Sequence, residues 1–168
     1  MEEDAPGIEL VREFLGVHEM LRVGLRRCSE LAQRAAAGLP PAQTAGEWPA
    51  LRSGSLLWEL RDNCFQHCFL LRRHHLGEDD ALFPELRVTD GSLSPVLDRL
   101  EAEHREIALL IDRVIQIAES ISGSGGEQGT GALVAGLRQL EEELLKHLSA
   151  EEEALVPALL RWREWPQP

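Results

Sequence analysis

Residues 74–86 of the chain read HHLGEDDALFPEL, and residues 147–159 read HLSAEEEALVPAL. A shift of 73 positions aligns the two stretches, so that a histidine, a glutamate, an alanine, two leucines and a proline fall on identical residues. In each copy the glutamate follows the histidine by four positions, which places both side chains on one face of an α-helix. The repeat therefore predicts two equivalent helices, each with a histidine and a glutamate on the same face.

The recurring residues are His74 with Glu78 in the first copy and His147 with Glu151 in the second. A shift of 86 positions aligns another pair of segments, in which His18 falls on His104 and apolar residues follow both histidines at the third and seventh positions. The chain therefore has the pattern of two helical hairpins built to one plan. Each hairpin supplies a single histidine from its first helix and a histidine–glutamate pair from its second.

Apolar residues recur at alternating steps of three and four in four long segments, which is the spacing of a core-facing helical stripe. These segments extend over about residues 8–37, 53–87, 94–118 and 131–163. In the third segment, Ser94 is the expected N-cap and Pro95 the first helical residue. The stripe of this segment consists of Leu97, Leu100, His104, Ile107, Ile111, Val114 and Ala118.

The connections between these segments, at residues 38–54, 88–91 and 122–131, have the composition of turns and loops. Long helices joined in this way predict an all-α fold, an antiparallel up-down-up-down four-helix bundle that forms one domain over residues 1–168. Pro84 and Pro157, which are equivalent in the repeat, are expected to kink or end their helices.

Counting along antiparallel helices places the recurring side chains at one level, because each residue adds about 1.5 Å to a helix. His18 lies ten residues from the start of the first predicted helix, and Glu78 lies nine residues from the end of the second. The corresponding residues of the second hairpin meet at the same end of the bundle. Six side chains that can ligate a metal are therefore expected in one layer: His18, His74, Glu78, His104, His147 and Glu151.

Four imidazole nitrogens and two carboxylates suit a pair of cations. If each glutamate bridges both metals, each metal receives two nitrogens and two carboxylate oxygens, and an oxo or hydroxo bridge adds a fifth ligand. This donor set favours two iron ions, with manganese and zinc as alternatives, because structural zinc prefers four ligands and more sulfur. A core in which the histidines only hydrogen-bond to the glutamates is the simplest alternative. It is disfavoured because two carboxylates buried together without a cation would be unstable or protonated.

These residues, His18 in HEMLR, the run HHLGEDDALFPEL, His104 in EAEHREI and the run HLSAEEEALVPAL, resemble the hemerythrin-like (HHE cation-binding) domain family over nearly the whole chain. The resemblance implies an up-and-down four-helix bundle with an oxo- or hydroxo-bridged di-iron centre that meets O2, NO or peroxide. Invertebrate oxygen carriers of the family place two histidines on the third helix and an aspartate five residues after the fourth-helix histidine. Here the third helix has only His104, a pattern that disfavours reversible O2 carriage and is more similar to bacterial members linked to redox or nitrosative stress.

Two further histidines align with leucines in the repeat, His67 with Leu140 and His75 with Leu148. Each is a candidate fifth histidine ligand, but this role is disfavoured for both. A core or supporting position is favoured for His67, and His75 lies at the flank of the apolar stripe. The neighbouring acids are interpreted as a solvated face around the site: Asp79, Asp80, Glu152 and Glu153. The cysteines are expected to pack in the core, with a second metal site that includes His67, or a redox-sensitive pair, as alternatives: Cys28, Cys64 and Cys68.

The formal net charge of −12 and the lack of a dense basic cluster disfavour nucleic-acid and anionic-lipid partners. No apolar run approaches the roughly 18 residues of a membrane span, and the acidic N-terminus lacks the regions of a signal peptide. Three cysteines without a regular framework suit a reducing compartment. We therefore expect a cytoplasmic protein without membrane or nucleic-acid partners.

The first functional hypothesis is a cytoplasmic non-haem di-iron protein that binds or turns over O2, NO or peroxide. Its expected role is redox or nitrosative stress sensing, detoxification or iron homeostasis. A second hypothesis is a non-enzymatic regulatory or interaction bundle with a structural metal such as zinc, and a third is iron storage or delivery. The residues indicate no nucleophile and set no oligomeric state, so catalysis stays an open question.

Overall fold

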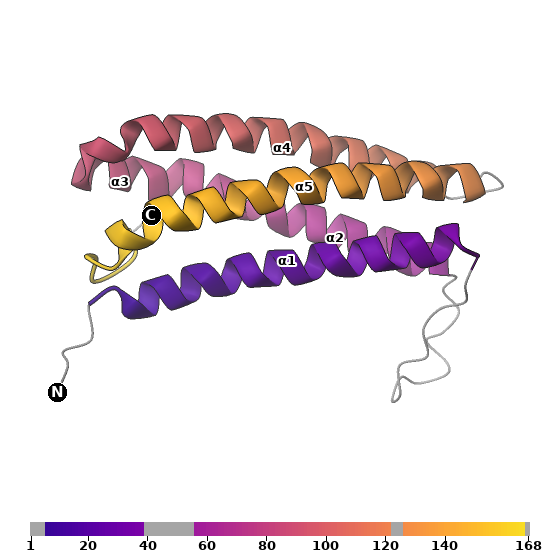
Figure 1. The fold of residues 1–168 in the computed structure, drawn as a ribbon, viewed down its shortest axis with the longest axis horizontal. Coiled ribbons are helices and arrows are strands. Elements are labelled where there is room, and N and C mark those ends of the chain that lie inside the picture. The colour runs from indigo at the N-terminus through magenta and orange to yellow at the C-terminus, as the bar shows by residue number, and fades with distance from the viewer. Residues whose placement is uncertain (1–5, 39–55, 122–125, 167–168) are drawn as a thin grey trace.

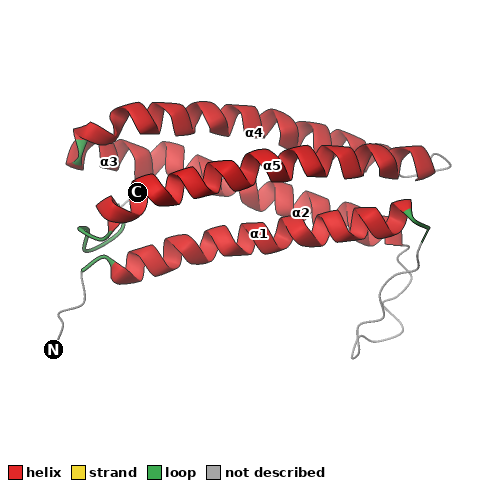
Figure 2. Cartoon of the chain, in the orientation of Figure 1, coloured by secondary structure: helices red, strands yellow, loops and turns green. Residues whose placement is uncertain are grey.

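The computed structural model describes residues 6–38, 56–121 and 126–166. Within these residues the elements are α1 (Ile8–Ala36), α2 (Leu56–Gly77), a π-helical turn (Glu78–Leu82), α3 (Phe83–Thr89), a 3-10 turn (Gly91–Leu93), α4 (Ser94–Ser120) and α5 (Gly126–Leu159). Because α2, the π-helical turn and α3 follow one another without a break, the described chain forms four helical rods. The predicted all-α four-helix bundle is confirmed, and no strand occurs among the described residues (Figure 2).

The rods run alternately up and down the bundle, as Figure 1 shows. α1 packs against α2 and α5, and α4 packs against the same two helices. The buried residues of α4 are the seven that the apolar stripe predicts, from Leu97 to Ala118. In α1 the buried residues likewise recur at steps of three or four, from Leu10 to Leu31. No described helix combines the length and the apolar character that a membrane crossing requires.

The core consists of two apolar clusters with a polar layer between them. One cluster includes Phe14, Phe83 and Leu97, and the other includes Leu21, Leu71 and many apolar residues toward the opposite end of the bundle. In α1, His18 lies between Phe14 and Leu21, and the same alternation recurs in the other rods. The apolar clusters hold the rods together on both sides of the layer and so fix the level at which the polar side chains meet.

The second rod differs from the continuous helix predicted for residues 53–87, whose first residues lie outside the described chain. The rod extends to Thr89, and residues Glu78–Leu82 form a wider π-helical turn. Pro84 follows this turn and has no N–H to donate to the preceding turn of helix. However, Pro157 occupies the equivalent position inside α5 without such a turn. Proline alone therefore does not account for the widening, and π-helical turns are common at functional sites.

Two helix starts also differ from the prediction. Ser94 is the first residue of α4, and Leu93 rather than Ser94 is its N-cap. The Asp90 carboxylate accepts a hydrogen bond from the backbone N–H of Ser92 (3.2 Å), so the chain is already helical when it reaches Ser94. α5 begins at Gly126 rather than at residue 131, because burial of Thr130 and Leu133 offsets the low helix propensity of the glycines.

The last turn of α5 ends at Leu159 rather than at residue 163, where the chain meets the start of α1. The backbone N–H of Gly7 donates a hydrogen bond to the carbonyl oxygen of Leu160 (3.2 Å). A Cβ atom at Gly7 would overlap the carbonyl group of Leu159. The close approach of these two backbones therefore requires glycine and ties the start of α1 to the end of α5.

Gly7→Ala should lower the free energy of unfolding by about 1–3 kcal/mol, because the added methyl group overpacks against backbone atoms that cannot rotate away. Gly16→Ala is the matched control on the same helix, since no atom lies within 4 Å of a Cβ there. This control should raise the free energy of unfolding by about 0.5–1 kcal/mol. Urea unfolding of both variants checks the pair, and equal stability of Gly7→Ala and the unsubstituted protein would contradict the contact.

Candidate metal centre

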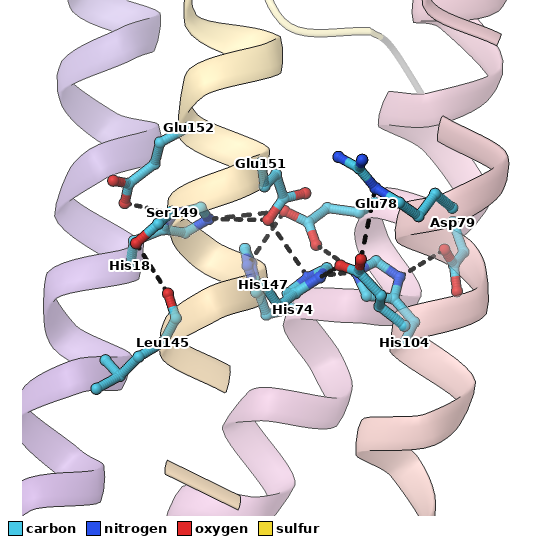
Figure 3. Close-up of polar contacts among 12 residues, drawn as sticks. His18, His74, Glu78, Asp79, His104, Leu145, His147, Ser149, Glu151 and Glu152 are labelled. Carbon is cyan, nitrogen blue, oxygen red and sulfur yellow. Dashed lines mark hydrogen bonds and ion pairs between the residues drawn. The ribbon is translucent and has the colours of Figure 1, made fainter. Parts of the chain in front are cut away.

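Buried polar side chains from all four rods meet in the layer between the apolar clusters (Figure 3). They form two groups, and within each group the potential ligand atoms lie within 4.8 Å of one another. The first group is His18, His74, Glu78 and Glu151, and the second group is His75, His104 and His147. The six side chains predicted to converge therefore do lie together, and they are joined by His75. Their role as metal ligands stays a prediction.

The two glutamates of the first group also face the second group, and Figure 3 shows them among His18, His74, His104 and His147. The Oε1 atom of Glu78 is 3.1 Å from Nε2 of His74 in the first group, and its Oε2 atom is 3.5 Å from Nε2 of His104 in the second. The Oε2 atom of Glu151 is 3.5 Å from Nε2 of His18 and 3.6 Å from Nε2 of His147. Both carboxylates therefore face imidazoles of both groups, which is the placement that a bridging ligand requires.

Carboxylates outside this layer hold two of the imidazoles in place. Nδ1 of His18 lies 2.8 Å from Oε1 of Glu152, and Nδ1 of His104 lies 2.7 Å from Oδ1 of Asp79. The interpretation of these two acids as a solvated face is wrong, whereas Asp80 and Glu153 are exposed. The repeat carried the missed signal, because Asp79 and Glu152 occupy equivalent positions and each directly follows a candidate bridging glutamate.

A third imidazole has a partner that the sequence did not indicate. Nδ1 of His147 lies 2.9 Å from Oε2 of Glu103. The repeat offers no acid at the equivalent place, since a shift of 86 positions aligns Glu103 with Val17. Outer carboxylates of this kind fix the orientation and the tautomer of a metal-binding imidazole.

Burial keeps the imidazoles neutral at pH 7. It lowers the pKa of His18, His74 and His104 to about 3, and it also lowers the pKa of His147. Because a carboxylate only accepts hydrogen bonds, each Nδ1 that faces one carries the proton, which leaves a lone pair on Nε2. The Nε2 atoms of His104 and His147 face one another at 3.0 Å. Two lone pairs at this distance repel one another unless a cation or a proton lies between them.

Burial also opposes negative charge on the two glutamates. It raises the pKa of Glu151 to about 8, and it raises the pKa of Glu78 well above its usual value, with the neighbouring Glu151 carboxylate as a further cause. Their four oxygens, with Nε2 of His18 and His74, have no hydrogen-bond partner within the described part of the chain. Neutral nitrogen and carboxylate oxygen donors that are buried together without partners fit one or two metal cations.

A pocket of about 480 Å³ reaches the first group from outside. Its lining includes His74 and Glu78, apolar side chains such as Phe14 and Leu70, and Trp165 near the C-terminus. No residue of the second group lines the pocket. Small molecules from solvent can therefore approach the first group directly.

His67 and the cysteines lie elsewhere in the core. Burial lowers the pKa of His67 to about 4, and its ring contacts the backbone at Gly24 rather than either group. Cys28, Cys64 and Cys68 are buried free thiols. They do not form, with or without His67, a group able to hold a metal among the described residues. Burial raises the pKa of the Cys68 thiol to about 12, so packing is the role that the geometry supports.

Comparison with known proteins agrees with this geometry. Related proteins include those called iron-sulfur cluster repair protein YtfE from Yersinia pestis (strain Pestoides F) and Yersinia pseudotuberculosis serotype O:1b (strain IP 31758), each 30% identical over 93 residues. The match covers 54% of this chain but only 42% of the length of each relative. No solved structure is significantly similar to the chain.

The model of one protein family, described as the hemerythrin HHE cation binding domain, matches residues 9–159. The matched range runs from the first turn of α1 to the last residue of α5 and includes every member of both groups. With this match over most of its length, the chain belongs to the hemerythrin HHE cation-binding domain family.

Proposed function

We propose that this protein is a non-haem di-iron protein whose two ions are held by His18, His74, Glu78, His104, His147 and Glu151. The observation that carries the proposal is the position of the two carboxylates, each of which faces imidazoles of both groups. A single ion would leave one group of buried lone pairs without a partner. Two ions joined by the carboxylates and by an oxo or hydroxo bridge satisfy both groups.

Iron is favoured over zinc by the donor set. Neither group contains a cysteine, and the two groups together supply more nitrogen and oxygen donors than two closed tetrahedral sites of structural zinc require. Manganese accepts the same donors and remains the closest alternative. The three thiols are buried in the apolar core and belong to neither group, so the geometry gives them no place in the metal site.

Iron held by these residues would supply the binding of O2, NO or peroxide and the exchange of electrons with them. The chain contributes orientation through Asp79, Glu103 and Glu152, which hold three of the imidazoles. The apolar clusters above and below the layer exclude water, and the pocket beside His74 and Glu78 admits the small molecule. The outer carboxylates lie on the Nδ1 side of these three imidazoles, so that their Nε2 atoms would face the metals.

We place this activity in the cytoplasm, in redox or nitrosative stress sensing, detoxification or iron homeostasis. The related Yersinia proteins are named for iron-sulfur cluster repair, which connects such a centre with damage to iron cofactors. Because the match covers under half of those proteins, their activity is carried over here only as a proposal. The same names favour iron delivery as a second candidate function. A capacity of two ions per chain argues against bulk storage.

The protein purified in air should contain about two iron ions per chain and absorb in the near-ultraviolet, as oxo-bridged di-ferric centres do. Azide, peroxide or NO should change this spectrum, because the pocket gives them access to the metal. Glu78→Gln should lose at least one of the two ions, since the amide is a poor bridging ligand. Glu153→Gln removes the same charge from an exposed position and should leave iron content and spectrum unchanged.

Metal analysis and absorption spectroscopy of these variants decide among the candidate functions. A colourless protein that binds zinc in preference to iron would contradict the di-iron proposal and favour the regulatory bundle. Iron that leaves the protein readily to a chelator or an apoprotein acceptor, without a response to O2, NO or peroxide, would favour delivery.

The metal-free protein should lose stability as pH rises from about 6.5 to about 8.5, because the folded state binds the proton of Glu151 more tightly than the unfolded chain does. The pKa of this carboxyl group rises from 4.5 to about 8 on burial, so its protonated form stabilises the fold and is lost across this range. The histidines contribute nothing above pH 6.5, since their lowered pKa values penalise the fold only at lower pH.

Urea unfolding at several pH values measures this effect. The metal-loaded protein should not weaken over the same range, because the cations stabilise the ionised carboxylates. Metal-free Glu151→Gln should lose most of the pH dependence. Equal pH profiles for the metal-free and metal-loaded proteins would show that no cation interacts with this carboxylate.

A further inference from the structure

His75 occupies a place in the layer that the six predicted residues do not explain. Its side chain is buried, with 5% exposed surface, and its Nε2 atom has no hydrogen-bond partner within the described residues. It shares the second group with His104 and His147, with ligand atoms within 4.8 Å of both. Its ring stacks on that of His104 at a centroid distance of 4.0 Å and an interplanar angle of 13°.

The register of α2 explains how two adjacent histidines reach different groups. Successive residues of an α-helix point about 100° apart, because one turn contains about 3.6 residues. His74 is directed toward the pocket and the first group, and its side chain is 11% exposed. His75 continues the buried positions Cys68 and Leu71 and is directed to the second group. One turn of helix thereby supplies an imidazole to each group.

The internal repeat shows that packing alone does not require a histidine at this place. The equivalent residue of the second hairpin is Leu148, which is fully buried in the apolar core. A leucine therefore fills the equivalent space, whereas an imidazole introduces a buried nitrogen that needs a partner. The potential ligand atoms of His104 and His147 lie within 4.8 Å of that of His75. Nitrogen lone pairs attract one another only through a shared proton or cation, and one cation can serve all three imidazoles, whereas a proton joins only two.

We propose that His75 is a metal ligand, the third imidazole of the ion held by His104 and His147. This inference rests on the proposed di-iron centre and specifies it further: the two positions are chemically different. One ion has the imidazoles of His75, His104 and His147, and the other has those of His18 and His74. The fifth histidine ligand is thus supplied by α2, since α4 contains only His104.

The matched variants for a test are His75→Leu and His67→Leu. Both replace a buried histidine of α2 by the leucine that its repeat equivalent carries, Leu148 or Leu140. Both side chains have an Nε2 atom without a partner among the described residues, but only His75 belongs to a metal-binding group. Loss of a buried polar atom is therefore common to the two variants, and loss of a ligand is specific to one.

The measurement uses Co2+ as a paramagnetic probe in the full chain. Proton NMR counts the strongly shifted, solvent-exchangeable imidazole N–H signals, one for each metal-bound histidine, and chelator competition gives the affinity for each ion. The unsubstituted protein should show five shifted signals. His75→Leu should show four signals and should bind one of its two ions at least 10-fold less tightly, while His67→Leu should keep five signals and both affinities within 2-fold of the original.

The outcomes separate this inference from the metal centre itself. If the unsubstituted protein binds no Co2+ and shows no shifted signals, the metal centre is absent, and the proposed role of His75 is contradicted as well. If it shows four signals, or if His75→Leu keeps the signal count and both affinities, the centre stands and His75 is not a ligand. The count on the unsubstituted protein decides the question even if His75→Leu fails to fold.

Discussion

Two carboxylates, Glu78 and Glu151, are buried close to one another in the polar layer of the bundle, and the rest of the site follows from that constraint. Burial raises the pKa of both, while it lowers the pKa of the surrounding imidazoles so that they carry no compensating charge. A core of this kind is stable at neutral pH only if protons or metal cations occupy it. A cation can satisfy several carboxylate oxygens and imidazole lone pairs at the same time, whereas each proton joins only one pair of atoms.

The two hairpins depend on one another through the acids outside the layer. Asp79 of the first hairpin orients His104 of the second, and Glu152 of the second orients His18 of the first. Each hairpin therefore completes the site of the other, and the site forms only when the bundle has closed. Exchange of equivalent residues relates most of the two halves of the site, with two exceptions: the counterpart of His75 is Leu148, and the counterpart of Glu103 is Val17. Both exceptions belong to or contact the second group and so distinguish it from the first.

Most of the fold could be predicted because the spacing of apolar residues in the sequence indicates which face of each helix is buried. All seven buried residues of α4 could be predicted, because the buried positions of a regular helix follow one constant spacing. The π-helical turn at Glu78–Leu82 could not be predicted, because one added residue in a turn leaves no distinct pattern and the equivalent Pro157 has no such turn. The partnership of Glu103 with His147 was equally hidden, because it arises between helices and has no counterpart in the repeat. The repeat places Asp79 and Glu152 at equivalent positions, but the sequence alone did not show that they hydrogen-bond to imidazoles of the layer.

Anomalous diffraction from crystals of the iron-loaded protein tests the central claim most directly. Data collected on the two sides of the iron absorption edge should give two peaks in the layer between the apolar clusters, one in each group, with Glu78 and Glu151 in contact with both. A single peak, or peaks only at exposed acidic residues such as Asp80 and Glu153, would contradict it.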